Sequence, residues 1–430
     1  MPIKKVVVTG LGAVTPLGND VPSTWRGLSQ GRSGVRRIRL FDAETFPTKI
    51  AGEVKDFDFS GWKNRGENFK SLGRHSFFAL EAANQAAADS GILSPGVVDP
   101  ARLGVYFGAG DGGFDFKQYA EILMESVNGS EAIEPSRYFA ASTHRLDPKI
   151  LWEQEPCRAV NHIAQFFKAK GMVSNCLTAC AASSQAIGEA AWAIRSGRAD
   201  VMISGGAHSM IHPLGVAGFN LLTALSTQND TPESASRPFD KNRDGFVLSE
   251  GAGVLILEEL EHAKKRGAKI YAELIGYGAT ADAFRMTDPH PQGRGAIRAM
   301  QNSLRDANLL PGDIDVINAH GTSTQLNDQV ETHSVKEVFG KKAYSIPMSS
   351  IKSMLGHMIA AAGAVEMIAS VLTIRDGLIP PTINYQTKDE ACDLDYVPNQ
   401  ARRAKVKTVL SNSFGFGGQN ITLIVKDFNG

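Results

Sequence analysis

The second half of this chain repeats the order of segments found in its first half. In the first half, an alanine-rich run ends in AIRSG (193–197), and the strand-like DVMISGGA and then GFVLSEGAGVLILEEL follow. In the second half, the run AAAGAVEMIASVLTIRDG ends in the matching TIRDG (373–377), and TVLSNSFGFGGQNITLIVKDF follows. Similarity in a fixed order of segments is the signature of a duplicated unit. The repeat therefore predicts two similar halves.

The boundary between the halves falls in LEHAKKRGAKIYAELIGYG (260–278), which reads as a last strand, a short charged link and a new first strand. We therefore expect an N-terminal half over 1–265 and a C-terminal half over 266–430. The duplication places Cys180 opposite the vicinity of Ala360, just after Lys352 and His357. Two helix starts are then expected to meet at one site.

Each half is predicted to be an α/β unit. Short β-branched runs closed by glycine, such as KKVVVTGLG and RLGVYFGAG, alternate with helical runs such as SFFALEAANQAAADSG. With 430 residues, of which 43% are apolar, the chain can bury extensive sheets.

Charge and cysteine content indicate which partners and which cellular compartment suit the chain. Forty-five basic residues balance forty-five acidic ones, so no overall field favours nucleic acid or an anionic membrane. The four cysteines show neither metal-type spacing nor the density of a secreted disulfide scaffold. No run approaches a membrane span or a signal peptide. These features favour the reducing cytoplasm and no membrane.

Cys180 lies in TACAASSQAIGEA, between a possible strand and a helical run. A helix start is expected to lower the pKa of a thiol from about 8.5 and so favour the nucleophilic thiolate. A lone cysteine among alanines is also typical of core packing. The residues around Cys180 leave both interpretations open.

Three further segments carry residue types that catalysis uses. His320 ends an apolar strand in DVINAHGTSTQLND, where Thr322 and Thr324 can bind a polar ligand arm, although a helix cap is the alternative. Lys352 and His357 share SSIKSMLGHMIAAAGAVE, which brings a cation and an imidazole to a helix start; a solvated turn is the alternative.

A glycine-rich segment, SNSFGFGGQN (411–420), is predicted to be a loop between strands. Its glycines permit close backbone approach, so that a backbone N–H can serve an oxyanion hole, with Phe414 and Phe416 forming an apolar gate. A plain hairpin loop is the alternative. GAGDGG (108–113) lacks the spacing of a dinucleotide fingerprint and predicts no nucleotide site.

Taken together, TACAASS, AHGTST, KSMLGH followed by AAAGAVE, and NSFGFGGQN closely resemble the motifs of the β-ketoacyl-acyl-carrier-protein synthases. The resemblance runs from VVVTGLGAVTPLG through PFDKNRDGFVLSEGAG to the final strand. It implies the thiolase fold, in which duplicated halves form a five-layered αβαβα arrangement. It also implies an acyltransferase that elongates fatty-acid or specialised polyketide or polyene chains by decarboxylative condensation with malonyl-carrier protein.

The resemblance assigns roles to individual residues. Cys180 would accept the acyl group, His320 and His357 would stabilise the enolate, and Lys352 would support His357 electrostatically. The backbone N–H groups of Cys180 and Phe416 would form the oxyanion hole. Further implied residues are Thr322, Thr324, Thr287 and Asp282 for the pantetheine arm, and Asn318, Glu366, Ser411 and Asn412 around a monovalent Na⁺ or K⁺ ion.

The resemblance also implies an acyl-carrier protein as partner, no redox cofactor, and a homodimer, with a heterodimer of related ketosynthases as an alternative. A non-catalytic chain-length subunit of such a heterodimer is the competing function, but those proteins characteristically lack the nucleophilic cysteine. Two departures leave the substrate open. Asp111 stands where the family usually places a small or apolar residue facing the acyl chain, and residues 134–171 lack the usual dimer-contact sequence.

Overall fold

The computed structural model describes residues 3–110, 115–127, 129 and 132–428. Its centre is a ten-stranded sheet with the strand order β10-β9-β13-β14-β8-β1-β7-β6-β4-β5. The first-half strands are β1 (Val6–Val14), β4 (Leu103–Gly108), β5 (Val173–Cys176), β6 (Val201–His208) and β7 (Gly251–Glu259). The second-half strands are β8 (Ala272–Ala281), β9 (Val316–Asn318), β10 (Met348–Ser349), β13 (Thr408–Gly415) and β14 (Gln419–Lys426).

The two halves of the sheet have the same topology. Outward from β1 the order is β7, β6, β4, β5, and outward from β8 it is β14, β13, β9, β10. In both series the first two pairings are antiparallel and the next two are parallel. The halves join through two residue pairs between β1 and β8, Val7↔Glu273 and Val8↔Ala272.

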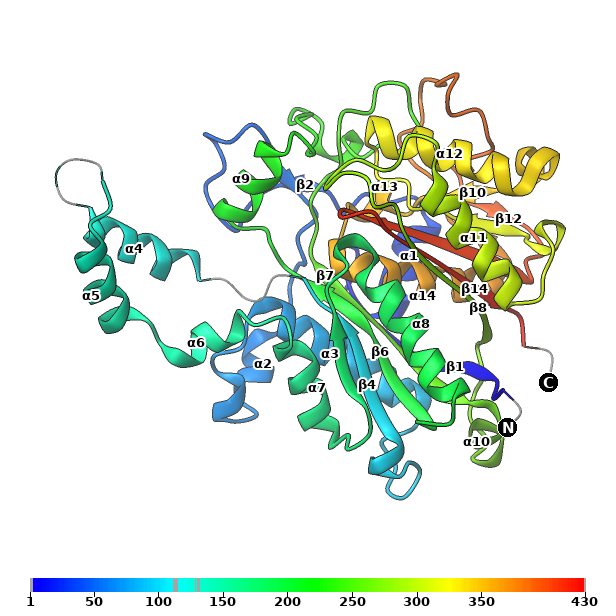
Figure 1. Cartoon of the computed structure of the whole chain (residues 1–430), viewed down its shortest axis with the longest axis horizontal. Helices are drawn as coiled ribbons and strands as arrows, with labels where there is room; N and C mark the ends of the chain where they lie inside the picture. The colour runs from blue at the N-terminus through cyan, green and yellow to red at the C-terminus, as the bar shows by residue number, and fades with distance from the viewer. Residues whose placement is uncertain (1–2, 111–114, 128, 130–131, 429–430) are drawn as a thin grey trace.

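Helices complete five layers around the two half-sheets (Figure 1). α3 (Arg74–Ser90) and α7 (Arg158–Phe167) cover the outer face of the first half-sheet. α11 (Arg294–Asp306) and α12 (Gln325–Phe339) cover that of the second, where apolar residues of α12 pack in one cluster with those of β9, β13 and β14. α8 (Ala182–Arg195) and α14 (Ala362–Asp376) form the central layer, because each contacts strands of both halves. The predicted α/β thiolase fold with an αβαβα order is confirmed.

The sequence of α14 explains its central position. Every residue from Ala362 to Ile374 is buried, as expected for a helix that is apolar on all sides. Small residues let it approach α8, since a Cβ added at Gly363 would lie 2.0 Å from Ser184 Oγ. The sheet is equally enclosed: all nine residues of β1, VVVTGLGAV, are buried.

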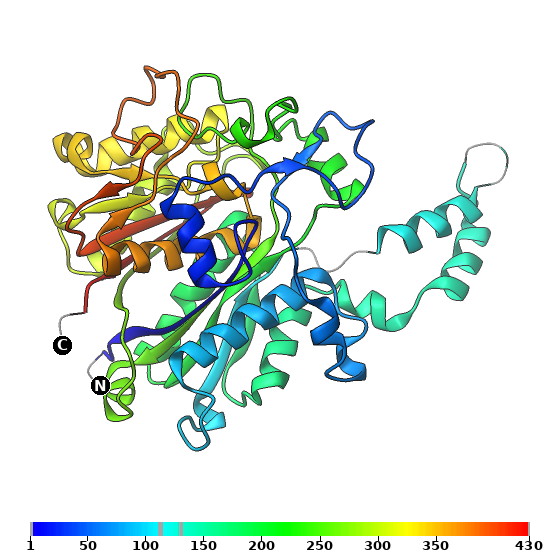
Figure 2. The same ribbon diagram turned by 180° about the vertical axis from the view of Figure 1, so that it is seen from behind.

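Shorter elements connect these layers, and the two termini lie close together (Figure 2). The short helices are α1 (Val21–Ser29), α2 (Phe59–Lys63), α9 (Pro213–Leu221), α10 (Leu260–Lys265) and α13 (Lys352–Leu355), and the short strands are β2 (Arg36–Arg37), β3 (Ile50–Ala51), β11 (Leu378–Ile379) and β12 (Arg402–Arg403).

Among the described residues, no helix has both the length and the apolar character needed to cross a membrane.

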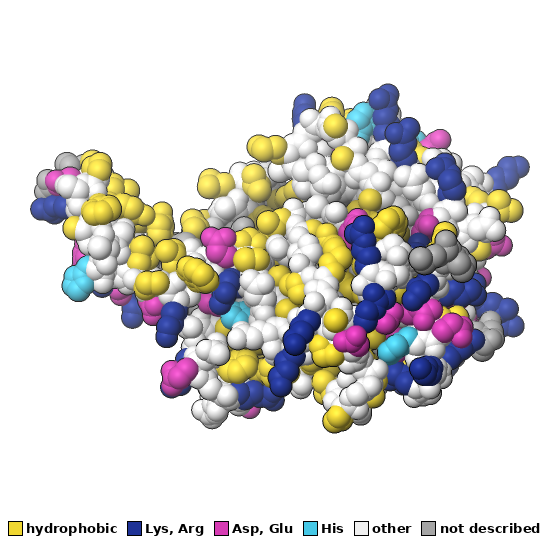
Figure 3. All heavy atoms as spheres, turned by 60° about the horizontal axis from the view of Figure 1, so that its bottom comes forward, with side chains coloured by type: hydrophobic (Ala, Val, Ile, Leu, Met, Phe, Trp, Pro, Cys, Tyr) yellow, Lys and Arg dark blue, Asp and Glu magenta, His cyan; other side chains and the backbone are white. Residues whose placement is uncertain are grey.

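Three helices project from the body as an arm (Figure 1). The arm consists of α4 (Phe116–Ser126), α5 (Pro135–Arg145) and α6 (Pro148–Glu153), so residues 134–171, which departed from the expected sequence, form α5, α6 and α7. Large apolar side chains lie exposed on the arm, among them Met124, Phe139 and Trp152, and Figure 3 shows apolar surface there. An exposed apolar set of this size is typical of a protein contact.

Candidate active site

The two equivalent helix starts meet at the centre of the molecule. Cys180 lies on a 3₁₀ turn, Ala179–Ala181, that leads into α8, and the matching turn Ile359–Ala361 leads into α14. Ala179 has φ 46° and Ile359 has φ 41°, a left-handed conformation that costs free energy for residues other than glycine. Both halves therefore hold the same strained turn at the same place.

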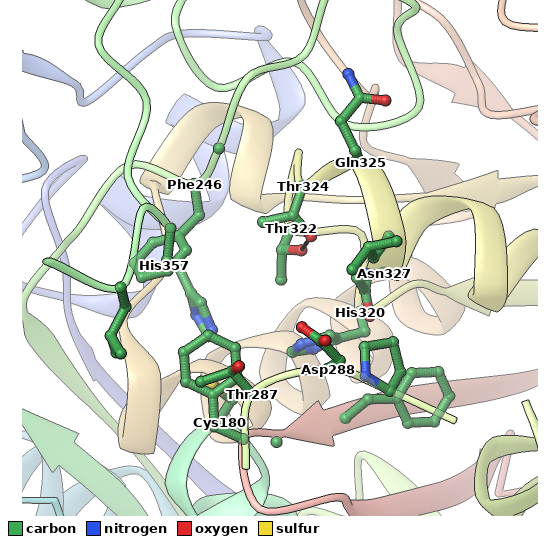
Figure 4. Close-up of a pocket in the computed structure, with 18 of the residues that line it drawn as sticks. Cys180, Phe246, Thr287, Asp288, His320, Thr322, Thr324, Gln325, Asn327 and His357 are labelled. Carbon is green, nitrogen blue, oxygen red and sulfur yellow. Dashed lines mark hydrogen bonds between the residues drawn. The ribbon is translucent and has the colours of Figure 1, made fainter. Parts of the chain in front are cut away.

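Cys180, His320 and His357 face one another across the active-site cavity (Figure 4). The sulfur of Cys180 and one ring nitrogen of each histidine lie within 4.8 Å of one another. The two imidazole rings are 5.5 Å apart between centroids, at 82°. His320 follows β9 and His357 follows α13, so the duplicated topology brings together three side chains that lie far apart in the sequence.

Lys352 contacts His320. Its Nζ donates to the backbone oxygen of His320 at 2.7 Å and lies 3.4 Å from His320 Nδ1. The ammonium also forms a buried ion pair with Glu366. The charge of Lys352 acts on His357 as the sequence comparison implied, and its hydrogen bonds add a direct contact with His320 that was not predicted.

Both histidines are neutral and present a ring N–H to the cavity. Burial, followed by the charge of Lys352, holds the pKa of each imidazole well below its usual value. The backbone N–H of Ile359 donates to Nδ1 of His357 at 3.3 Å, so the ring hydrogen is on Nε2, which has no partner among the described residues. In His320 the Lys352 ammonium faces Nδ1, which likewise assigns the hydrogen to Nε2.

The environment of Cys180 raises its thiol pKa to about 11, mainly through burial. Lys352 and the backbone N–H groups of Phe416 and of Cys180 itself act in the opposite direction, since they favour the thiolate. The prediction that the helix start lowers this pKa is therefore wrong for the free enzyme. The removal of water from the thiolate raises the pKa by more than the N–H groups at the helix start lower it. The same N–H groups are the predicted oxyanion-hole donors, and both lie at the sulfur.

The segment from Ser411 to Asn420 is a tight hairpin rather than a loop throughout. Ser411 to Gly415 belong to β13, and β14 begins at Gln419. Gly415 is required by close approach, since a Cβ there would lie 2.7 Å from the carbonyl oxygen of Thr178 and 3.3 Å from the nitrogen of Cys180. The ring of Phe414 lies 5.8 Å from that of His320, and Phe416 lines the cavity.

The active-site cavity has a volume of about 290 Å³ and includes most of the predicted binding residues. Thr322 and Thr324 line it, with their hydroxyl oxygens 2.9 Å apart. Lining residues that the sequence motifs did not single out include Phe246, Asp288 and Asn327. Phe246 packs edge-on against His357 at 5.3 Å between ring centroids.

Asp282 and Thr287, which were predicted to bind the pantetheine arm, also line the cavity. Asp282 accepts from Asn420 Nδ2 and from the backbone N–H of His290, each at 2.9 Å. Its own backbone N–H donates to the Gly418 carbonyl oxygen at 2.8 Å. The carboxylate therefore ties the 282–290 loop to the hairpin that carries Phe416.

Two buried carboxylates on α12 hold the loop of His320, and the sequence motifs missed them. Glu331 accepts from the backbone N–H groups of His320 and Gly321, each at 2.8 Å. Asp328 accepts from the N–H of Thr322 at 3.0 Å and lies 3.6 Å from the buried guanidinium of Arg243. Acidic residues three apart on one helix, NDQVE, were the available signal, because that spacing places both on one face.

Three of the four residues predicted around a monovalent cation offer oxygens that fit such an ion. Asn318 Oδ1, Glu366 Oε2 and Ser411 Oγ are buried and have no hydrogen-bond partner in the part of the chain that is described. Asn318 and Ser411 are paired across β9 and β13, and Asn318 Nδ2 donates to the Glu366 carbonyl oxygen at 3.0 Å. Unpaired buried oxygens are costly unless a cation or water satisfies them. Asn412 Oδ1 instead accepts from Thr422 at 2.9 Å.

One predicted site residue cannot be placed. Asp111 lies outside the described residues, which end on that side at Gly110.

Two family models together match most of the chain. A model described as "Beta-ketoacyl synthase, N-terminal domain" matches residues 4–263, and one described as "Beta-ketoacyl synthase, C-terminal domain" matches residues 271–386. The two matches meet close to the boundary between the halves.

Individual proteins match over the full length. The chain is 47% identical to the 3-oxoacyl-[acyl-carrier-protein] synthase 2 of Coxiella burnetii, covering 98% of each chain. It is 45% identical to the protein of that name from Synechocystis, covering 99% of this chain and 98% of the other. A solved ketosynthase, bound to a hexaketide and in complex with its type II polyketide-synthase acyl-carrier protein, has a TM-score of 0.88 at 37% identity, covering 99% of this chain and 100% of the other.

Proposed function

The chain belongs to the beta-ketoacyl synthase family and is a beta-ketoacyl-acyl-carrier-protein synthase, and we propose that Cys180, His320 and His357 carry out its chemistry. The observation that carries the proposal is the convergence of one thiol and two neutral imidazoles within 4.8 Å in a buried cavity. A nucleophile with two hydrogen-bond donors is the set that acyl transfer followed by enolate formation requires.

The first step transfers the acyl group to Cys180. The sulfur attacks the thioester carbon of an acyl-carrier protein, a C–S bond forms to Cys180, and the bond to the pantetheine sulfur breaks. The proton of the Cys180 thiol is transferred overall to the departing pantetheine thiolate. The N–H groups of Cys180 and Phe416, together with Lys352, stabilise the negative charge that develops during this exchange.

The second step joins the two chains. Malonyl-carrier protein binds with its pantetheine arm along Thr322 and Thr324, and its C–C bond to the carboxylate breaks with loss of carbon dioxide. The resulting enolate oxygen accepts hydrogen bonds from the Nε2–H groups of His320 and His357. The carbanion then attacks the acyl carbon, a C–C bond forms, and the Cys180 thiolate leaves and is reprotonated. Each oxyanion donor of this kind typically contributes about 10²–10³ in rate.

The charges around His320 suit this role. A protonated imidazole would give its proton to the enolate and so quench the carbanion. Burial and Lys352 keep both rings neutral, so each ring donates a hydrogen bond and retains its proton. The hydrogen bonds that Glu331 accepts from the backbone N–H groups of His320 and Gly321 fix the position of the His320 backbone. The non-catalytic chain-length subunit is the less favoured function, since the chain has the cysteine and both histidines.

Neither step transfers an electron or a hydride, so we propose that no redox cofactor takes part. Asn318, Glu366 and Ser411 would hold a monovalent cation such as Na⁺ or K⁺, with Asn412 beside them. Such an ion would supply a fixed positive charge that balances the buried carboxylate oxygen of Glu366.

We propose an acyl-carrier protein and a second related subunit as partners. The acyl-carrier protein in complex with a similar ketosynthase supports the first. The edge strand β5 supports a homodimer, because β4 is its only partner among the described strands. Val173 at its start and Leu177 just after its end are exposed. The exposed apolar arm also suits a subunit contact. A related ketosynthase subunit fits the same surfaces. The cytoplasm remains the proposed location.

The basic cluster Lys63, Arg65, Lys70 and Arg74 is a weaker candidate for carrier-protein docking. Arg74 bonds Glu250 at 3.0 Å, and the guanidinium of Arg65 stacks on Trp62 at 4.1 Å from the ring centroid. Lys70 pairs with Glu67. Only part of the cluster is therefore a free basic surface.

Mass spectrometry of the Cys180 peptide, after incubation with a panel of acyl-carrier proteins, tests the proposal. We expect a thioester adduct on Cys180 whose mass identifies the preferred acyl chain. Cys180→Ala should remove the adduct, and Cys176→Ala, a matched control four residues away, should retain it. Adduct on another residue, or none with any acyl group, would contradict the proposed role of Cys180.

A further inference from the structure

Arg243 is a buried arginine to which the proposed chemistry gives no role. It is 1% exposed, and the three residues that follow it, Asp244, Gly245 and Phe246, line the active-site cavity. Burying a guanidinium is costly unless its N–H groups are bonded and its charge is paired. The hydrogen bonds of Arg243 therefore show which parts of the site it holds in place.

The guanidinium of Arg243 binds the end of the loop that carries the two threonines proposed to contact the pantetheine arm. Its Nε donates to the carbonyl oxygen of Thr324 and its Nη2 to that of Gln325, each at 3.1 Å. Its Nη1 donates to the Asp240 carbonyl oxygen and to Asp389 Oδ2, each at 2.7 Å. A guanidinium can serve several acceptors at once because its donors form a rigid planar fork. Arg243 therefore fastens the threonine loop to two other segments of the chain.

Backbone and side-chain hydrogen bonds run between the Arg243 segment and the threonine loop in both directions. Gln325 Nε2 donates to the carbonyl oxygen of Arg243 at 2.5 Å, and the N–H of Gly245 donates to the carbonyl oxygen of Ser323 at 3.1 Å. Ser323 has φ 72°, a left-handed conformation that surrounding contacts must maintain in a residue other than glycine. These bonds therefore hold a strained turn between the two threonines.

The strained turn sets where the two threonine hydroxyls lie. Thr322 and Thr324 flank Ser323, and their hydroxyl oxygens are 2.9 Å apart at the wall of the active-site cavity (Figure 4). Asp328, whose carboxylate lies 3.6 Å from the guanidinium of Arg243, accepts from the backbone N–H of Thr322 at 3.0 Å. Arg243 therefore holds Thr324 directly, through its carbonyl oxygen, and Thr322 through Asp328.

We propose that Arg243 is a positioning residue for the pantetheine arm, because it fixes the loop on which Thr322 and Thr324 present their hydroxyls to that arm. This inference rests on the proposed function, since it takes both threonines as binding residues of the arm. Contacts remote from the reacting bond still control the rate there, and a misplacement of about 1 Å can cost about 10²-fold. Loss of Arg243 should therefore slow reactions of substrates that carry the arm and spare those that lack it.

The test compares two acyl donors for Cys180 in the full-length enzyme. One is an acyl-pantetheine thioester, and the other is the thiophenyl ester of the same acid, which has no pantetheine arm. Quenched mass spectrometry of the Cys180 peptide gives the second-order rate constant of acylation for each donor, and the readout is the ratio of the two constants. A change in folding or in the thiol alters both constants equally, whereas a change in arm positioning alters only the first.

Arg243→Lys keeps the positive charge beside the buried carboxylates but has too few donors, on too short a reach, to bond every acceptor of the guanidinium. We expect the ratio, arm-bearing donor over armless donor, to fall about tenfold in this variant. Arg266→Lys is the matched control and should keep the parent ratio. Arg266 follows α10 and bonds another buried carboxylate, that of Glu258, at 2.6 Å.

Two further variants trace the effect. The fall caused by Arg243→Lys should be smaller when it is added to Thr324→Val than when it is added to the parent, because the hydroxyl that Arg243 positions is already absent. Asp389→Ala, which removes the carboxylate that anchors Nη1 and leaves Arg243 in place, should lower the ratio by a smaller factor than Arg243→Lys does. Thermal unfolding identifies any variant that does not fold, and Asp389→Ala replaces Arg243→Lys if the latter is one of them.

A parent-like ratio in the folded Arg243 and Asp389 variants would overturn the inference, even though acylation itself upheld the proposed function. An equal loss with both donors in Arg243→Lys would overturn it as well, because that result shows a structural role only. So would fully additive effects in the double variant, which would separate Arg243 from the threonines. Absence of Cys180 acylation by either donor in the parent would instead remove the proposed function, and this inference with it.

Discussion

The ammonium of Lys352 lies 2.7 Å from the backbone oxygen of His320 and 3.4 Å from its Nδ1. This contact determines which nitrogen of His320 faces the substrate. Because an ammonium has three donors and no acceptor, Nδ1 must present its lone pair to it, and Nε2 carries the hydrogen toward the cavity. The lysine is therefore a positioning residue for the enolate donor, and it favours the Cys180 thiolate as well.

Removing Lys352 is expected to affect condensation strongly. Lys352→Met alone would leave Glu366 buried and unpaired, which typically destabilises a protein by about 3–5 kcal/mol. The variant Lys352→Met/Glu366→Gln avoids that charge. We expect its kcat for condensation to fall about 10²–10³-fold with a smaller change in KM, because an oriented donor is lost. Glu366→Gln alone is the control. An equal fall in kcat in the single and the double variant would show that Lys352 does not position His320.

The thiol of Cys180 should behave as a protonated group in the free enzyme. Its pKa of about 11 means that the thiolate fraction rises about tenfold for each pH unit between 7 and 10. The rate of iodoacetamide modification, followed at the Cys180 peptide, should rise in the same way. Cys180→Ala supplies the background. A plateau of the rate below pH 8 would show a lowered pKa and contradict the dominance of burial.

Two buried neutral histidines, His75 and His208, should make stability depend on pH. Below pH 6.5 the unfolded chain takes up protons at His75 and His208, whereas the native protein does so only near pH 4 and pH 3. The free energy of unfolding therefore falls as the pH falls through this window. Between pH 7 and pH 5, each histidine should account for a loss of about 2 kcal/mol.

Denaturant unfolding of the parent and of His75→Leu at pH 7 and pH 5 measures this effect. The variant should lose less stability on acidification than the parent does. The groups facing His75 are Glu153, His162 and His208, and those facing His208 are His75, His212 and His357. An identical loss in both proteins would show that His75 takes up its proton in the native state as readily as in the unfolded chain.

The duplication made much of the fold predictable from the sequence. Matching segments gave two α/β halves, and the same comparison placed Cys180 opposite Ala360, where the structure has two equivalent strained turns. The motif residues Cys180, His320 and His357 converge because equivalent strand ends and helix starts in the two halves face one central point.

Other features depend on packing that no motif records. Whether burial or the helix start controls the pKa of Cys180 depends on how much solvent the folded protein removes, and burial prevails. The partner of Lys352 depends on the place where α13 begins, shortly after β10, the strand that pairs with the β9 strand preceding His320. Glu331 and Asp328 bind backbone N–H groups, so their spacing in the sequence shows that they share a helix face but not which loop they hold. Nothing in the sequence sets His208 apart, and only the structure shows that both its ring nitrogens lack a hydrogen-bond partner among the described residues.

The most direct test of the account is a single-turnover condensation. Enzyme acylated on Cys180 is mixed with malonyl-carrier protein, and carbon dioxide and β-ketoacyl product are measured together in the parent, His320→Gln and His357→Gln. The account predicts equal amounts of both products in the parent and a loss of about 10²–10³ in the rate of carbon dioxide release in each variant. Decarboxylation at the parent rate in both variants, or β-ketoacyl product from Cys180→Ala, would contradict it.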